Sequence, residues 1–166
     1  MALIDALLPE FDREMGLTRR VLDRVPDAHF EWRPHPTSVT LGRLAEHLCD
    51  LAHWAAITMN ESSFAMTTDR PADYVRPATR DAVLALFDAN LKSGRAAVAG
   101  KTDAEFAAPW KLISGGKEVF TMPKAAVMRN FVLNHMIHHR GQMLVYLRML
   151  GVPIPSIYGP SGDEKM

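Results

Sequence analysis

Apolar side chains recur at spacings of three and four along four stretches of the chain, which is the period of an amphipathic helix. The first stretch covers residues 2–25, although Pro9 lacks an amide donor and is expected to end or kink the first turns. The second stretch begins near Thr40 and the third after Thr79, and threonine is a common N-cap. The third stretch ends around Gly100, since glycine favours a helix C-terminus.

The last apolar stretch spans about residues 124–150 and predicts a long final helix that ends at Gly151. A different pattern precedes it. Residues 109–123 contain two short runs on either side of Gly115 and Gly116, the signature of a tight hairpin turn. A lone hairpin is marginally stable in water, so we expect this one to lie against the helices.

The connections after the first two helices, residues 26–39 and 61–78, are punctuated by prolines and are expected to be loops. Four long helices, one small hairpin and no alternation of strands with helices predict an all-α fold, a four-helix bundle. The 166 residues are most economically one domain, residues 1–166, around one hydrophobic core. Periodicity alone leaves the order and handedness of the helices open.

Composition excludes several classes of function. Nineteen basic residues balance nineteen acidic ones, so no basic footprint favours binding to nucleic acid or to an anionic membrane. Cys49 is the only cysteine, which excludes an intrachain disulfide. The first residues lack the basic start and long apolar run of a signal peptide, and no apolar run approaches the length of a membrane span. We therefore expect a soluble, cytoplasmic protein.

Three histidines fall close together in the segment FVLNHMIHHRGQM, residues 131–143. Successive helical residues rotate by about 100°, which places His135 and His139 inside the main apolar stripe and His138 at its edge. The other side chains in that sector are Met128, Phe131, Val132, Gln142, Met143 and Tyr146. Two histidines four residues apart on one helix face have the geometry of helical zinc sites.

The second helix presents His47 at the centre of its own apolar face, whereas His53 and Cys49 point elsewhere. If both apolar faces line the interior, His47 meets His135 and His139 there. Buried neutral imidazoles each need a hydrogen-bond partner, or they can share one divalent cation. The residues alone leave both interpretations open: a core histidine cluster, or a three-histidine metal site with open coordination positions.

Side chains beside the histidines are candidates for a substrate pocket. Trp54, Gln142 and Tyr146 share faces with them, with core packing as the alternative for Trp54. Asp50 either orients a ligand from the His47 side or lies in solvent. Arg140 projects away from the histidine face and is expected to form a structural ion pair or a dimer contact.

The final helix is also apolar on its reverse side, where Leu133, Ile137 and Leu144 lie. A helix apolar on two faces is buried on two sides, by the hairpin, the tail or a second subunit. We favour the second subunit and expect a homodimer.

The segment HMIHHRGQMLVYLRMLGVPIPSIYGPS (135–161) closely resembles the closing segment of the DinB/YfiT-like proteins, whose hallmark is a histidine, three residues, then His-Arg-Gly-Gln. FEWRP (30–34), followed by TLGRLAEHLCDLAHW (40–54), is similar to the family's Trp-x-Pro loop and its ligand-bearing second helix. The likeness spans nearly the whole chain, and the combined pattern is more specific than any one part.

This resemblance implies a bundle of the family's up-down-down-up type, often dimeric. It also implies a divalent metal, nickel or zinc before iron, held by the residues that match the family's ligands: His47, His135 and His139. Characterised relatives include bacillithiol S-transferases and the mycothiol-dependent maleylpyruvate isomerase, which use low-molecular-weight thiols as cosubstrates.

The favoured function is a metal-dependent enzyme that acts on a small electrophile, as a thiol S-transferase or a hydrolase. The alternative is a non-catalytic, stress-associated dimer that binds a metal or ligand. No catalytic residue is assigned, because no inward-facing carboxylate is fixed by spacing. Imidazole ligands suit zinc, nickel, iron and copper alike, so the sequence leaves the metal's identity open.

Overall fold

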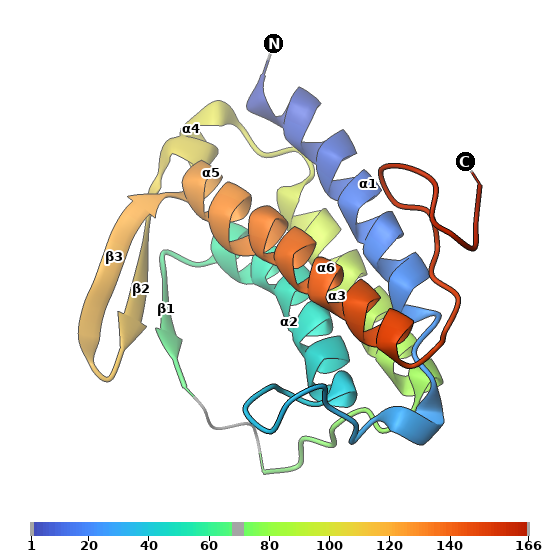
Figure 1. The fold of residues 1–166 in the computed structure, drawn as a ribbon. Coiled ribbons are helices and arrows are strands. Elements are labelled where there is room, and N and C mark those ends of the chain that lie inside the picture. Colours follow the sequence, from blue (N-terminus) through green and yellow to red (C-terminus); the bar gives the residue numbers. More distant parts are fainter. Residues whose placement is uncertain (1, 68–71, 166) are drawn as a thin grey trace.

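The computed structural model describes residues 2–67 and 72–165, and long helices dominate it (Figure 1). The bundle is made of α1 Leu3–Leu22, α2 Leu41–Asn60, α3 Arg80–Val98 and one continuous last stretch, α5 Lys124–Val127, η2 Met128–Asn134 and α6 His135–Met149. α2 packs against α3 and α6, and α1 closes the other side of the bundle against the same two helices. α2 and α3 run in one direction and α1 and α6 in the other, which is the up-down-down-up arrangement (Figure 1).

Both threonines predicted to cap helices do so. Thr40 Oγ1 accepts a hydrogen bond from the Arg43 amide at 3.2 Å, and Thr79 Oγ1 accepts one from the Ala82 amide at 3.2 Å. Each bond satisfies one of the amide donors that the first turn of a helix leaves without an internal partner. The starts of α2 and α3 are therefore fixed by local sequence.

Pro9 lies inside α1 and does not end it. Leu7 and Phe11, on either side of the proline, are both buried in the main core. Their burial offsets the one backbone hydrogen bond that the proline removes. The helix ends at Leu22 rather than at Val25, where the periodicity places its end.

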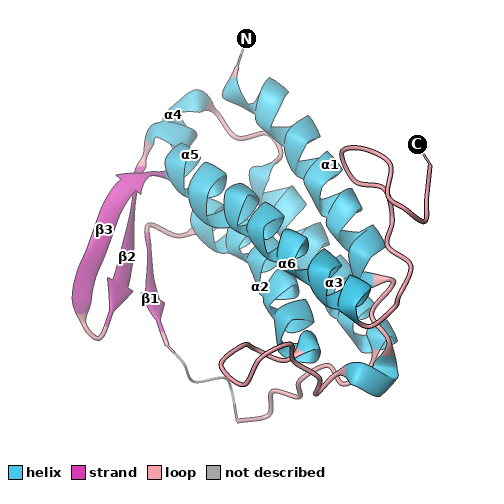
Figure 2. Cartoon of the chain, viewed as in Figure 1, coloured by secondary structure: helices cyan, strands magenta, loops and turns pink. Residues whose placement is uncertain are grey.

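A small three-stranded sheet lies at one end of the bundle (Figure 2). Its strands are β1 Ser63–Met66, β2 Pro109–Ser114 and β3 Lys117–Pro123. β2 and β3 form the predicted hairpin, with φ values of 56° at Gly115 and 75° at Gly116 that suit glycine. β1 pairs in parallel with β2, so the expectation of a loop throughout residues 61–78 is wrong for this strand. The strand has four residues and only Phe64 is even partly buried, so it carries no alternating pattern.

Two short helical segments join the longer elements: η1 Asp27–His29 and α4 Asp103–Ala107. Thr102 and Glu105 cap α4 reciprocally, each side chain accepting the other residue's backbone amide. Among the described residues, no helix combines the length and apolar content that crossing a bilayer requires.

The sheet covers a second apolar cluster beside the main core. Trp110, Leu112 and Val127 are buried in it, and the partly buried side chains around them are Trp54, Ile57, Phe64, Phe120, Met122 and Phe131. These contacts confirm that the hairpin lies against the helices.

The last helical stretch contains a π-helical segment, η2, just before the histidines. A π-helix holds more residues per turn than an α-helix, so a 3.6-residue period misplaces its side chains. Met128 and Val132 enter the main core, whereas Phe131 joins the second cluster under the sheet. The α-helical period resumes at His135.

Candidate metal centre

Three half-buried histidines from two helices meet inside the bundle: His47 of α2, and His135 and His139 of α6. His47 Nε2 lies 3.4 Å from His135 Nε2, which lies 2.8 Å from His139 Nε2. One nitrogen from each ring lies within 4.8 Å of the others. The prediction that two apolar helix faces bring these three histidines together is confirmed.

The electrostatic setting favours the neutral form of His135 and His139. Burial lowers the pKa of His135, and the neighbouring His139 and His138 lower it further. Burial also lowers the pKa of His139, although its hydrogen bond to Gln142 acts in the opposite direction. A neutral imidazole carries a lone pair on its unprotonated nitrogen, which is the form that binds a metal.

The geometry of the cluster fits a divalent cation. Tetrahedral coordination at Zn–N bonds of 2.0–2.1 Å places ligand nitrogens about 3.3 Å apart. Two of the three nitrogen pairs, at 2.8 and 3.4 Å, bracket that value, and all three nitrogens lie within 4.8 Å of one another. Three neutral nitrogen donors are also the ligand set of metal sites that keep positions open for substrate or water. Since imidazole suits several transition metals, the ion's identity is not set by this donor set.

Gln142, predicted to line a substrate pocket, directs its carboxamide at two histidines. Its Oε1 lies 2.7 Å from His139 Nδ1, and its Nε2 lies 3.1 Å from His138 Nε2. His138 is exposed and lies outside the three-histidine group, as its position at the edge of the apolar stripe predicts.

The other two pocket candidates lie in opposite directions from the histidines. Trp54, two turns beyond His47 on α2, contacts the aromatic side chains under the sheet, with ring centroids 5.4 Å from Phe64 and 6.4 Å from Trp110. Tyr146 of α6 lies near the loop before α2, with its ring centroid 5.6 Å from that of Trp32 in an edge-to-face arrangement. The two side chains therefore flank the cluster, and both are partly buried.

Arg140 forms the structural ion pair expected for it. Its guanidinium is buried on the side of α6 away from the histidines, 2.6 Å from Glu14 Oε2 of α1. Tyr158 of the C-terminal tail completes the group, because its hydroxyl lies 2.6 Å from both Arg140 and Glu14. Arg140, which follows His139 in the motif, therefore links α6 to α1 and to the C-terminal tail.

The remaining sequence candidates lie away from the cluster or at its edge. Cys49 is buried against the carbonyl oxygens of Ala45 and Val83, and burial raises the pKa of its thiol. His53 is exposed, as predicted. An Asp50 carboxylate oxygen lies 3.9 Å from the Arg43 guanidinium, and Asp50 is not a member of the three-histidine group.

A polar network beside His47 escaped the sequence analysis. Glu46 is 1% exposed and accepts hydrogen bonds from Arg43 at 2.8 Å, Tyr74 at 2.7 Å and Arg76 at 2.6 Å. Burial alone would raise the pKa of Glu46, but the Tyr74 hydrogen bond and the two arginine charges outweigh it and leave that pKa below its ordinary value. The network fastens residues 74–76 onto α2.

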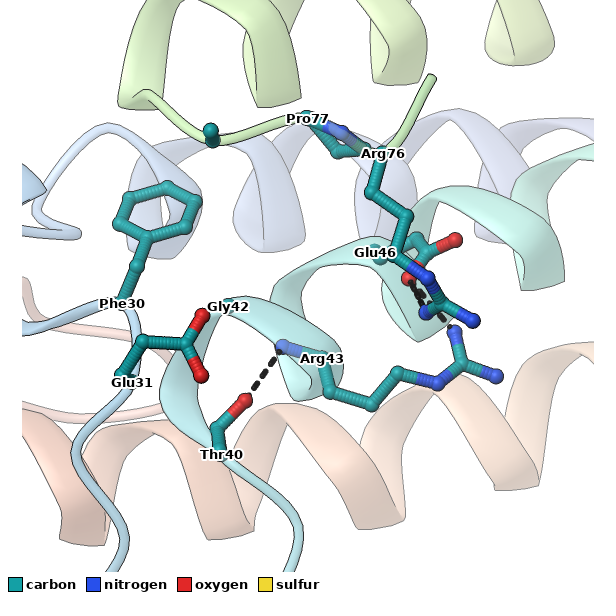
Figure 3. Close-up of a pocket in the computed structure, with 9 residues that line it drawn as sticks. Phe30, Glu31, Thr40, Gly42, Arg43, Glu46, Arg76 and Pro77 are labelled. Atoms are coloured by element: carbon teal, nitrogen blue, oxygen red, sulfur yellow. Dashed lines mark hydrogen bonds and ion pairs between the residues drawn. The ribbon is translucent and has the colours of Figure 1, made fainter. Parts of the chain in front are cut away.

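A cavity of about 260 Å³ borders this network (Figure 3). Its lining residues are Phe30, Glu31, Thr40, Gly42, Arg43, Glu46, Arg76, Pro77 and Ala78. The two arginines and two glutamates balance in charge, so the lining favours neither anions nor cations.

Comparisons with known proteins agree with this architecture. The uncharacterised protein YrdA of Bacillus subtilis (strain 168) is 29% identical over 164 residues, covering 97% of this chain and 91% of that protein. The crystal structure of a DinB-like protein from Bacillus cereus ATCC 10987 superposes with a TM-score of 0.72 at 24% identity, over 95% of this chain and 98% of that one. The DinB-like protein YjoA of Bacillus subtilis gives a TM-score of 0.69 at 17% identity, over 90% and 96% of the two chains.

At these identities the solved structures bear on the fold alone. The family model for DinB proteins, however, matches residues 2–165, which is nearly the entire chain. The chain therefore belongs to the DinB family.

Proposed function

We propose that this protein binds one divalent metal ion through His47, His135 and His139 and uses it to act on a small electrophilic molecule. The observation that carries the proposal is the convergence of three half-buried imidazoles, each with one ring nitrogen within 4.8 Å of the others. Zinc and nickel are the favoured ions, with iron as a further candidate, because all three accept imidazole ligands.

The favoured reaction is transfer of a low-molecular-weight thiol to the electrophile, and hydrolysis is the second candidate. When bound, the cation supplies the Lewis acidity that favours deprotonation of a thiol or a water. The three histidines hold the ion by neutral nitrogens and leave its other positions to substrates. Cys49 is buried with a raised thiol pKa, so a thiol substrate has to come from outside the chain.

A non-catalytic role in binding a metal or ligand is the alternative function. The donor set favours this alternative, because the three-histidine group contains no aspartate or glutamate among the described residues. A general base is therefore not built into the candidate ligands, and turnover relies on deprotonation at the metal or on groups of the substrate.

Metal content tests the site directly. Protein purified without a chelating tag should hold about one ion per chain by elemental analysis, and His135→Ala should abolish this binding while largely keeping the fold. His53→Ala is the matched control, because that histidine is on α2 but exposed. Unchanged metal content in His135→Ala would show that the three-histidine assignment is wrong.

A turnover assay distinguishes a metal-dependent enzyme from a protein with the non-catalytic binding role. The metal-loaded protein should consume an alkyl halide or an epoxide in the presence of a low-molecular-weight thiol, or an ester in its absence. Stoichiometric metal with no turnover across such a panel would favour the non-catalytic role. Activity that persists after His135→Ala would contradict a metal-dependent mechanism.

We also propose that the protein forms a homodimer. On the reverse side of the last helix Leu133 is buried and Leu144 packs on the main core, so the chain itself covers much of that face. Val145 and Met149, four residues apart on α6, remain 57% and 58% exposed and are the better candidates for an interface. A monomer mass in light scattering at micromolar concentration would contradict the dimer.

A further inference from the structure

Gln142 lies between His139, a candidate metal ligand, and His138, which is outside the three-histidine group. Its Oε1 is 2.7 Å from His139 Nδ1, and its Nε2 is 3.1 Å from His138 Nε2. On α6 it follows these histidines by three and four residues, the two spacings at which helical side chains touch. Gln142 and His138 are exposed, whereas His139 is half-buried.

We propose that Gln142 is a positioning residue that fixes the tautomer and ring orientation of His139 for metal binding, and that His138 holds Gln142 in place. This inference rests on the proposed function of the three-histidine group. The His139 nitrogen that faces His135 is Nε2, at 2.8 Å, and an imidazole binds a metal only through an unprotonated nitrogen. The His139 proton then belongs on Nδ1, where it is donated to Gln142 Oε1.

The proton on His139 Nδ1 determines which way the carboxamide faces, and His138 accepts from its amide group. With Oε1 accepting from His139, the Gln142 amide group points at His138 and donates to its Nε2. That nitrogen accepts only when unprotonated, so the proton of a neutral His138 belongs on Nδ1. The reverse orientation of the carboxamide would set its N–H group against the N–H group of His139. One arrangement of protons therefore satisfies the whole chain of contacts.

Loss of the acceptor should weaken metal binding without unfolding the protein. Partners that orient a ligating histidine typically affect metal affinity by about 10–100-fold, so we expect Gln142→Leu to raise the zinc Kd by that factor. Gln142→Glu should restore wild-type affinity or exceed it, because a carboxylate is a stronger acceptor for the His139 proton. His138→Leu should have a smaller effect, since the His138 ring is hydrogen-bonded to Gln142 and not to the His139 Nδ1 atom.

Competition titration with a chromophoric chelator measures the zinc Kd of each variant, and Asn130→Leu is the matched control. Asn130 also carries an exposed carboxamide, but it lies in η2, outside the group of histidine contacts. The Tm values of the metal-free variants should equal that of the wild type. Nitrogen NMR of the zinc-loaded wild type should place the His139 proton on Nδ1, which a purely structural role for Gln142 would not require.

Three results would overturn the positioning role: a wild-type Kd for Gln142→Leu, equal weakening by Asn130→Leu, or no rescue by Gln142→Glu. A His139 proton on Nε2 in the zinc-loaded protein would overturn it as well. A wild-type protein that binds neither zinc nor nickel would instead refute the proposed metal site, and the positioning role would fall with it. The wild-type titration thus distinguishes the two failures.

Discussion

Replacing Arg140 with methionine should destabilise the fold strongly and leave the histidine cluster intact. Arg140 is 1% exposed and Glu14 is 5% exposed, and their side chains are 2.6 Å apart. Methionine keeps much of the arginine volume but leaves the Glu14 carboxylate buried, with the Tyr158 hydroxyl as its one remaining side-chain partner among the described residues. Removing one member of a buried ion pair costs about 3–5 kcal/mol.

That loss is a substantial fraction of the free energy of unfolding of a domain, which is about 5–15 kcal/mol. For a chain of this size each kcal/mol corresponds to about 2–4 °C in Tm, so Arg140→Met should lower the Tm by about 6–20 °C. Replacing both partners by apolar residues removes the stranded charge. The double variant Glu14→Met with Arg140→Met should therefore be more stable than Arg140→Met alone.

Urea unfolding followed by circular dichroism, in the presence of a chelator, gives the free energies for this double-mutant cycle. The chelator is needed because a bound ion would stabilise the native state by mass action. A loss below about 1 kcal/mol for Arg140→Met, or free energies that simply add in the double variant, would refute a buried, coupled ion pair. Metal affinity in folded Arg140→Met should match the wild type, since Arg140 lies away from the cluster.

Three further predictions concern the cysteine, the histidines and a helix contact. Cys49 should resist iodoacetamide in the native protein and react in urea, because burial raises its pKa and thiolate is the reactive form; mass spectrometry showing native modification would contradict this. The metal-free protein should lose stability as the pH falls below 6.5, because burial lowers the pKa of His135 and His139 in the folded state and the unfolded chain takes up protons first. The contribution of the two histidines to the free energy of unfolding is fully present above pH 6.5. Equal urea midpoints at about pH 7.5 and about pH 5.5 would contradict this prediction. Gly94→Ala should cost about 1–3 kcal/mol in a thermal unfolding assay, because the added Cβ would lie 2.5 Å from the Ala52 carbonyl oxygen, and an unchanged Tm would rule this out.

Local rules predict the features of this chain that depend on neighbouring residues. The caps at Thr40 and Thr79 and the glycine turn at residues 115–116 are each set within a few positions. The contact between His47 and His135 is tertiary, yet the sequence of each helix is enough to predict it. Each histidine lies within the apolar stripe of its own helix, and both stripes face the same core.

The features that escaped prediction depend on partners far away in the sequence or on an irregular helix. β1 is a strand because β2 lies beside it, and Glu46 is buried as an ion because Tyr74 and Arg76 reach it from a segment without periodicity. Phe131 leaves the predicted sector because η2 is π-helical. Helical spacing places Gln142 beside His139, but the direction of its carboxamide depends on a rotamer that spacing does not set.

The π-helical segment also bears on how the chain can change length. A π-type hydrogen bond spans one residue more than an α-type bond, so deletion of one exposed residue in η2, such as Asn130, would convert the segment toward an α-helix. The faces on either side of the deletion would stay nearly in phase. The same deletion in α2 between its N-cap and His47 would rotate that histidine by about 100° relative to the residues before the gap. The last helix can therefore lose one residue in η2 and keep its histidines in place, whereas α2 cannot lose one before His47. A sequence that is one residue shorter just before the histidine motif can still form the same cluster.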